Sequence, residues 1–334
     1  MINPDYLYPY LNKHLCMHLI LKKLASKTYD ILLLPLTWIY LPLVKKMRQH
    51  GVEYFPLHVK SFERLGVFPI RNHYYDPRFV FDKNFDPTAE RGLQIDFKVP
   101  AQLQLLNSLQ YSGELAAFPA KGDIDVPKFF YENLSFSYGD AEMYYLFIRN
   151  LKPKRIIEIG SGNSTLIAIE AIRKNKEEGF ETQMTCIEPY EFKWLETIPE
   201  VTIHRQKVEE VSLDFFAALN AGDFLFIDSS HIIRPGNDVL FEYLNLLPVL
   251  KKGVIIHIHD IFSPNHYLAE WLVNFKRFWN EQYLLEAYLY YNNAFEIKMA
   301  LNLLKNQHYD ELKRVCPGIS ETTTPASFWL EKVQ

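Results

Sequence analysis

The sequence contains few cysteines, only three among 334 residues. Cys16, Cys186 and Cys316 lie far apart, lack the paired spacing of a zinc site and form an odd number. This usage excludes a small secreted fold held together by disulfides and is typical of a reducing compartment. We therefore expect a cytoplasmic protein.

An excess of positive charge is also absent. The formal net charge is −4 at pH 7, and no long basic stretch with interleaved aromatic residues occurs. A surface that binds nucleic acid needs such a basic patch. We therefore expect no nucleic-acid partner.

The sequence lacks an apolar run long enough to cross a bilayer as a helix. The run at residues 31–44 is interrupted by Pro35 and Pro42 and is flanked by lysine and arginine residues. A spanning helix needs roughly 20 apolar residues, and no small-residue cleavage site follows that would mark a secretory signal. For residues 31–48 we favour a buried helix pair that packs on the main domain. The alternative is a peripheral contact with the anionic inner face of a membrane.

With 334 residues the chain is long enough for one large domain and an extension. Because 48% of its residues are hydrophobic, it can bury a substantial core. Residues 5–50 have helical, apolar character. Residues 51–100 are rich in Pro, Phe and Tyr and keep no period for long, which predicts an irregular cap. We expect a helical N-terminal extension with this cap over residues 1–134 and a single domain over residues 135–334.

Short apolar strands alternate with helical segments in the second half of the chain. The expected helices cover 100–109 and 141–150, and the expected strands cover 155–159, 183–187, 201–204, 223–227 and 253–258, with 295–301 and 327–332 as candidate edge strands. Such a pattern predicts a mainly parallel sheet covered on both faces. The fold class is therefore a doubly wound, Rossmann-like α/β sheet, with ligands outside the carboxyl ends of its strands.

The first of these strands runs into a glycine turn. Gly160, Ser161 and Gly162 permit a tight turn with close backbone approach before a helix, as in nucleotide-binding loops. A dinucleotide fingerprint, however, has a third Gly or Ala where this chain has Thr165. The carboxylate of Glu158 would also repel a pyrophosphate.

A cationic nucleoside without phosphate fits this turn better. S-adenosylmethionine carries an ammonium that can contact Glu158 and the carbonyls of the turn. Its ribose diol can donate to a second acid, and Glu188 ends the next strand where that role requires. The sequence therefore predicts an S-adenosylmethionine site.

Four motifs, RIIEIGSGNST, CIEP, DFLFIDSSH and GVIIHIHDIF, follow in this order. Together they resemble the successive motifs of class I S-adenosylmethionine-dependent methyltransferases, above all bacterial small-molecule methyltransferase domains. The resemblance covers about residues 135–300. It implies a seven-stranded sheet with an antiparallel final strand, and substrate over the fourth and fifth strands. It implies cofactor contacts at Tyr138 and Asp140 near the methionine end and at Val208 and Glu209 beside the adenine, and we add Asp228 and Ser229 after the fourth strand.

Histidines and acids follow the fourth and fifth strands. Parallel neighbours bring these strand ends together beside the transferable methyl group. Transfer to a hydroxyl requires that a base take the hydroxyl proton, and histidine suits this task. We predict His231 as the base and His259 as the second candidate, with Asp260 also catalytic. His257 can instead be a core histidine, and Asp260 can instead cap a helix.

A divalent metal is the rival explanation of this cluster. Asp228 and Asp260 match two positions at which catechol-type methyltransferases hold a cation, but Ile261 stands where that pattern has an Asn. His231 or His259 can replace the missing ligand and would favour a transition metal. The metal therefore stays an open alternative.

Two further regions can contact an acceptor. Residues 279–293 form an aromatic helical segment that begins with Asn280, Glu281 and Tyr283. The cap also carries hydrogen-bond donors and aromatic rings that can bind a sugar-like or anionic acceptor. The alternative is that these residues only attach the cap to the sheet. They are Arg71, His73, Tyr74, Tyr75 and Arg78.

The resulting prediction is a methyltransferase that acts on an oxygen of a small molecule or glycan. The rivals are an NAD-dependent oxidoreductase and a non-catalytic, membrane-adjacent protein that keeps the fold.

Overall fold

The computed structural model describes residues 13–70, 77, 86, 89, 91–124, 126–133, 135–275 and 277–334, with residues 13–21, 273 and 274 described for the backbone only. The chain divides into two compact units, residues 1–86 with 269–278 and residues 87–268 with 279–334. Residues 87–134 thus belong to the unit that holds the sheet, beyond the boundary predicted near residue 135. The predicted cap residues Arg71, His73, Tyr74, Tyr75 and Arg78 lie outside the described residues.

The first unit is helical. It contains α1 (Lys13–His50), η2 (Val52–Tyr54), α2 (Pro56–Leu65) and η7 (Glu270–Asn274). Residues 31–48 are part of one helix, α1, in which both prolines are accommodated, and their apolar side chains are mostly exposed. Residues 31–48 thus form part of one continuous helix and not the predicted pair of helices. Within the described residues, no helix combines the length and apolar character needed to cross a membrane.

Helix α2 falls in the segment predicted to be irregular. Pro56 occupies its first turn, and Gly66 ends it with a φ of 66°. Phe62 of α2 is buried with Val44 and Met47 of α1, and Phe55 packs against them. Both end signals were readable in the sequence, since proline favours the first helical position and glycine the position after the last.

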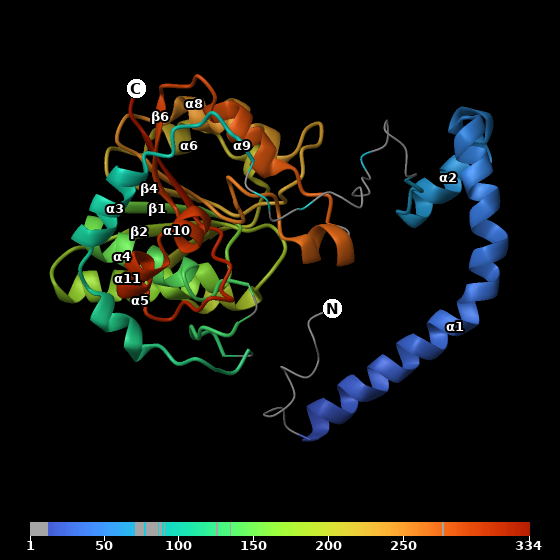
Figure 1. Cartoon of the computed structure of the whole chain (residues 1–334), viewed down its shortest axis with the longest axis horizontal. Coiled ribbons are helices and arrows are strands. Elements are labelled where there is room, and N and C mark those ends of the chain that lie inside the picture. Colours follow the sequence, from blue (N-terminus) through green and yellow to red (C-terminus); the bar gives the residue numbers. More distant parts are fainter. Residues whose placement is uncertain are drawn as a thin grey trace. The chain divides into compact units, whose positions relative to one another are not determined.

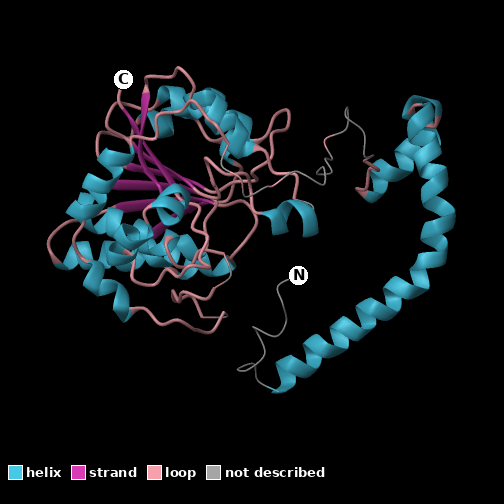
Figure 2. Ribbon diagram, in the orientation of Figure 1, coloured by secondary structure: helices cyan, strands magenta, loops and turns pink. Residues whose placement is uncertain are grey.

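The second unit contains one seven-stranded sheet in the order β3-β2-β1-β4-β5-β7-β6 (Figure 2). The strands are β1 (Arg155–Ile159), β2 (Gln183–Ile187), β3 (Val201–His204), β4 (Phe224–Ile227), β5 (Ile255–Ile258), β6 (Phe295–Ala300) and β7 (Phe328–Lys332). Neighbours are parallel except that β7 is antiparallel to β5 and β6. The doubly wound fold with an antiparallel final strand is confirmed. Of the two candidate edge strands, β6 lies at an edge of the sheet, whereas β7 lies between β5 and β6.

Helices cover both faces of this sheet (Figures 1 and 2). The helices of the second unit are α3 (Val99–Ser108), η3 (Ser112–Ala117), α4 (Asp140–Leu151), α5 (Asn163–Glu177), η4 (Lys193–Thr197), η5 (Val208–Glu210), α6 (Leu213–Ala217), α7 (Asp238–Phe241), η6 (Glu242–Leu246), α8 (Leu247–Val249), α9 (Glu281–Leu289), α10 (Leu301–Gln307) and α11 (Tyr309–Val315). Helices α4 and α5 pack together, and α6 packs with α8. Every residue of β4 and β5 is buried as a result, which explains their continuous apolar sequences.

The strand order reverses between β1 and β4. Strand β2 follows β1 on one side, and β4 pairs with β1 on the other. Ligands of doubly wound sheets bind outside the carboxyl ends of the strands at such a point. The fold therefore directs attention to the loops after β1, β2 and β4.

Candidate active site

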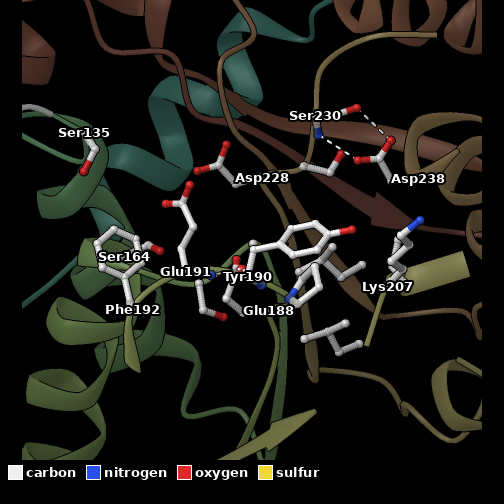
Figure 3. A pocket seen from close by; sticks show the side chains of 18 of the residues that line it. Ser135, Ser164, Glu188, Tyr190, Glu191, Phe192, Lys207, Asp228, Ser230 and Asp238 are labelled. Atoms are coloured by element: carbon white, nitrogen blue, oxygen red, sulfur yellow. Dashed lines mark hydrogen bonds between the residues drawn. The ribbon is translucent and has the colours of Figure 1, made fainter. Parts of the chain in front are cut away.

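A cavity of about 590 Å³ opens at this reversal point (Figure 3). The loops after β1, β2, β3 and β4 supply most of its wall. Its lining includes Gly160, Ser161, Gly162, Glu188, Glu191, Val208, Glu209, Asp228 and Ser229. The sequence predicted eight of these as cofactor contacts, the exception being Glu191. The topology thus brings most of the predicted contacts together around one cavity.

The glycine turn after β1 admits no side chain at its first glycine. Gly160 has a φ of 75°, and a Cβ there would lie 1.8 Å from the carbonyl oxygen of Asp228. A Cβ at Gly162 would lie 3.0 Å from the Phe192 ring. The hydroxyl of Ser161 is buried without a hydrogen-bond partner among the described residues. The turn thus brings bare backbone and an available hydroxyl to the cavity wall.

Glu158 does not line this cavity. Its carboxylate is fully buried beneath the turn and accepts hydrogen bonds from Tyr144 (3.2 Å), Ser164 (3.1 Å) and Thr165. Burial raises the pKa of Glu158 to about 7, although the three hydroxyls oppose that rise. The predicted direct contact with an ammonium finds no support, because the local hydroxyls already occupy this carboxylate. Glu158 instead holds the turn and the start of α5 together.

Glu188 lies at the end of β2 and faces the cavity. Its Oε1 accepts hydrogen bonds from the backbone N–H groups of Tyr190 (2.8 Å) and Glu191 (2.9 Å). These bonds fix the carboxylate, and Oε2 has no hydrogen-bond partner within the described part of the chain. A carboxylate held in this way can accept bonds from a diol.

Tyr138 and Asp140, which the resemblance placed near the cofactor, do not line the cavity either. The Tyr138 ring stacks on Tyr131 with 4.4 Å between ring centroids. Asp140 accepts hydrogen bonds from the N–H groups of Ala326 (2.9 Å) and Ser327 (2.7 Å) just before β7. Both residues are occupied in joining separate parts of the second unit.

The predicted histidines and acids converge on Asp228. Its Oδ1 lies 3.2 Å from Nε2 of His231, and its Oδ2 lies 3.4 Å from Nδ1 of His259. Asp260 approaches both rings, at 3.5 Å from His231 and 3.7 Å from His259. On its other side, Nε2 of His259 lies 3.5 Å from Asp140. We call Asp228, His231, His259 and Asp260 the His/Asp cluster.

Charge and burial shift every pKa in the His/Asp cluster. Burial alone would lower the pKa values of His231 and His259, but the facing carboxylates raise both well above the usual value. Lost hydration would raise the pKa of Asp228, but the two imidazoles lower it. Burial raises the pKa of Asp260. The cluster therefore pairs two buried imidazoles with two half-buried carboxylates, and of its four members only Asp228 lines the cavity.

Two backbones in this cluster are strained. His231 has a φ of 59° and Asp260 a φ of 58°, in the left-handed region that is costly for residues other than glycine. Such strain persists where the surroundings impose it and is concentrated at functional sites. The carbonyl of His231 accepts hydrogen bonds from the N–H groups of Asn280 (2.9 Å) and Glu281 (3.2 Å), which hold this conformation.

Glu281 is the site residue whose role the sequence did not reveal. It was predicted to line a substrate pocket, but it is fully buried and its Oε2 lies 2.8 Å from Nδ1 of His231. The Tyr243 hydroxyl donates to its other oxygen at 3.0 Å. Asn280 accepts a bond from the N–H of Ile233, and Tyr283 contacts His266. None of the three lines the 590 Å³ cavity.

His257 and Asp260 each had an alternative role, as a core histidine and as a helix cap. His257 is a core residue whose ring stacks on Trp329 at 3.9 Å, and burial lowers its pKa well below the usual value. Its ring nitrogens have no partner among the described residues. Asp260 precedes a stretch without helix that continues to η7, so it caps no helix there.

The His/Asp cluster also contains a possible cation site. Ligand atoms of Asp228, His259 and Asp260 lie within 4.8 Å of one another. One imidazole and two carboxylates suit a divalent transition metal better than magnesium, which prefers oxygen ligands. His259 thus offers a third ligand atom where Ile261 cannot supply one.

Comparison with known proteins agrees with this geometry. Residues 157–261 match the family model of a methyltransferase domain. This match confirms the likeness of the domain to class I S-adenosylmethionine-dependent methyltransferases.

Individual relatives are more distant. An uncharacterized protein of Archaeoglobus fulgidus is 32% identical over 137 residues, which are 40% of this chain and 61% of that protein. The chain thus spans about three fifths of the length of this relative.

Two solved structures are similar at low identity. An O-methyltransferase from Bacillus cereus in complex with S-adenosylhomocysteine has 12% identity and a TM-score of 0.34 over 70% of this chain and 91% of its own. The plantazolicin methyltransferase BpumL has 16% identity and a TM-score of 0.36 over 58% of this chain and 83% of its own. At these scores the likeness supports no statement about substrate.

Proposed function

We propose that this protein, with its methyltransferase domain, transfers a methyl group from S-adenosylmethionine to an oxygen of a small-molecule or sugar-like acceptor. One observation carries the proposal. Asp228 lines the cavity formed by the glycine turn and also contacts His231 and His259. A candidate base therefore lies one side chain away from the proposed cofactor site.

The residues around the cavity fit the cofactor. The bare backbone at Gly160 and the buried hydroxyl of Ser161 suit the methionine end, whose carboxylate needs donors. Oε2 of Glu188 is placed to accept from the ribose diol. Val208 and Glu209 line the cavity after β3, where an adenine ring can lie against the valine.

When bound, S-adenosylmethionine supplies a methyl group on a sulfonium, a carbon already open to attack. The chain then has two tasks, to orient the acceptor oxygen in line with that carbon and to accept its proton. We assign proton transfer to Nε2 of His231, the nitrogen that faces Asp228 and Asp260, while Nδ1 faces Glu281. Because the facing carboxylates raise the pKa of His231, the ring accepts a proton only after it has lost its own to solvent, and activity should therefore rise with pH. His259 is the second candidate. A cation bound by Asp228, His259 and Asp260 would polarise the acceptor oxygen instead.

Calorimetric titration with S-adenosylhomocysteine tests the cofactor half of the proposal. We expect binding, and we expect Glu188→Gln to weaken it about tenfold to a hundredfold, because a bond to a charged partner contributes about 1.5–3 kcal/mol. Glu191→Gln is the matched control, since Glu191 lines the same cavity and is exposed. Absence of binding would contradict the proposal, as would thermal stabilisation by NAD alone.

The acceptor half needs a screen. Incubation with methyl-labelled S-adenosylmethionine and a panel of hydroxylated sugars and phenols should yield labelled product from at least one class. Transfer only to amines or thiols would rule out an oxygen acceptor.

We also propose a cytoplasmic location. The thiols of Cys186 and Cys316 are free and buried in the second unit. Free buried thiols are typical of proteins kept in a reducing compartment.

A further inference from the structure

Helix α1 exposes apolar side chains around its whole circumference. The side chains that are at least half exposed between residues 31 and 43 are Ile31, Leu32, Leu34, Leu36, Trp38, Ile39, Leu41 and Leu43. A helix on the surface of a globular protein has one apolar stripe, and a helix that is apolar all round is surrounded by apolar material. Among the described side chains of this helix, the small core with Phe62 buries Val44 and Met47.

The same stretch hides its few polar groups. The Thr37 hydroxyl donates to the carbonyl of Leu33 at 3.1 Å, and Thr28, nine residues earlier, donates to Leu24 at 3.0 Å. Apart from the exposed Trp38 and Tyr40, residues 31–44 therefore offer water no free hydrogen-bonding side chain.

Positive charge flanks the apolar stretch at both ends. Lys22, Lys23 and Lys27 precede it, and Lys45, Lys46 and Arg48 follow it. Residues 13–70 contain nine Lys or Arg and three Asp or Glu, a formal charge of +6, whereas the remaining residues together carry −10. The chain thus concentrates its positive charge around its exposed apolar helix.

We propose that residues 31–48 of α1 bind in the interfacial layer of an anionic lipid bilayer. Fourteen residues of helix extend about 21 Å, short of a hydrocarbon core of about 30 Å, so this segment lies within one face of the bilayer. Trp38 and Tyr40 are exposed on it, and such rings favour the headgroup level. The basic residues at both ends match anionic headgroups. A second copy of the chain would cover only one side of the helix.

Flotation of the full chain with lipid vesicles tests this proposal, and it needs neither cofactor nor acceptor. We expect binding to vesicles of phosphatidylcholine with phosphatidylglycerol and weak binding to phosphatidylcholine alone. Each basic residue near an anionic surface strengthens binding about fivefold. The variant Lys45→Glu with Lys46→Glu and Arg48→Glu should therefore bind at least about a hundredfold more weakly.

Two single variants separate lipid contact from charge. Trp38→Glu should reduce binding to the mixed vesicles at least about tenfold without changing thermal unfolding. Leu244→Glu, at an exposed leucine of the second unit, is the control and should bind like the natural chain. Binding to neither vesicle overturns the proposal. So does a mass that doubles with concentration in the absence of lipid and that Trp38→Glu returns to one chain, because a second copy then covers the helix.

Discussion

The two halves of the candidate site are built differently. On the cofactor side, Gly160, Glu158 and Thr165 lie within eight residues, and the turn is held by bonds among near neighbours. On the acceptor side, His231 is held by Glu281, fifty residues further along the chain. The first half depends on local backbone geometry, and the second on tertiary packing. Substitutions should therefore affect cofactor binding and methyl transfer separately.

The largest separation is expected at His231. His231→Asn should lower the methyl-transfer rate about 10²- to 10⁴-fold through loss of the base, while S-adenosylhomocysteine binding stays within a few-fold. Asparagine tolerates the positive φ of 59° at this position, so the backbone should keep its path. His308→Asn, between α10 and α11, is the control. A parallel loss of cofactor binding would show that the two halves are not independent.

The opposite effect is expected at Gly160. Gly160→Ala forces a Cβ against the Asp228 carbonyl and should weaken S-adenosylhomocysteine binding at least about tenfold, with a destabilisation of several kcal/mol. Gly179→Ala is a matched control, because Gly179 has a φ of 87° but no atom near its added Cβ. That control should cost only about 1–2 kcal/mol in urea unfolding. Equal losses for both variants would mean that strain, and not the close approach to Asp228, explains Gly160.

Glu158 gives the cofactor side its own dependence on pH. The pKa of its carboxyl rises from 4.5 to about 7 on folding. Between these values the folded state holds a proton that the unfolded state has lost, so stability falls as pH rises through this window. The fall amounts to about 3 kcal/mol. Glu158→Gln should remove it in urea unfolding of the cofactor-free protein, and an unchanged pH profile would contradict this assignment.

A smaller effect is expected at Glu281. Glu281→Gln should lower kcat about tenfold with little change in KM, because a neutral amide makes a weaker hydrogen bond to Nδ1 of His231 and orients the ring less firmly. Glu286→Gln on the same helix is the control, since Glu286 bonds Arg91 and Ser263 and does not contact His231. Equal changes in kcat and KM would indicate a structural role for Glu281 alone.

Local patterns explain what the sequence predicted well. The bounds of β1, β2 and β3 agree with the predicted runs, because short apolar strands alternate with helical segments in a parallel sheet. The lining residues of the glycine turn and Glu188 were also predictable, since they follow strand ends in a doubly wound sheet.

The features that could not be predicted from the sequence depend on contacts between residues far apart in the chain. The insertion of β7 between β5 and β6 follows from tertiary pairing, and so does the Glu281–His231 contact. Glu158 was predicted to contact a ligand because its three hydroxyl partners could not be read from the sequence. One of them, Tyr144, lies on the preceding helix. Exposure of residues 31–43 could not be read from hydrophobicity, which favours burial in general.

The position of β7 has a consequence for synthesis of the protein. Strands β1 to β5 and all cluster residues precede residues 328–332 in the chain, yet β5 pairs with β7 on one side, and Asp140 anchors the backbone just before it. A nascent chain that still lacks those residues would carry every site motif, but the side of β5 that pairs with β7 would have no partner. We therefore expect the sheet to be complete only after residues 328–332 have been synthesised and have paired with β5 and β6.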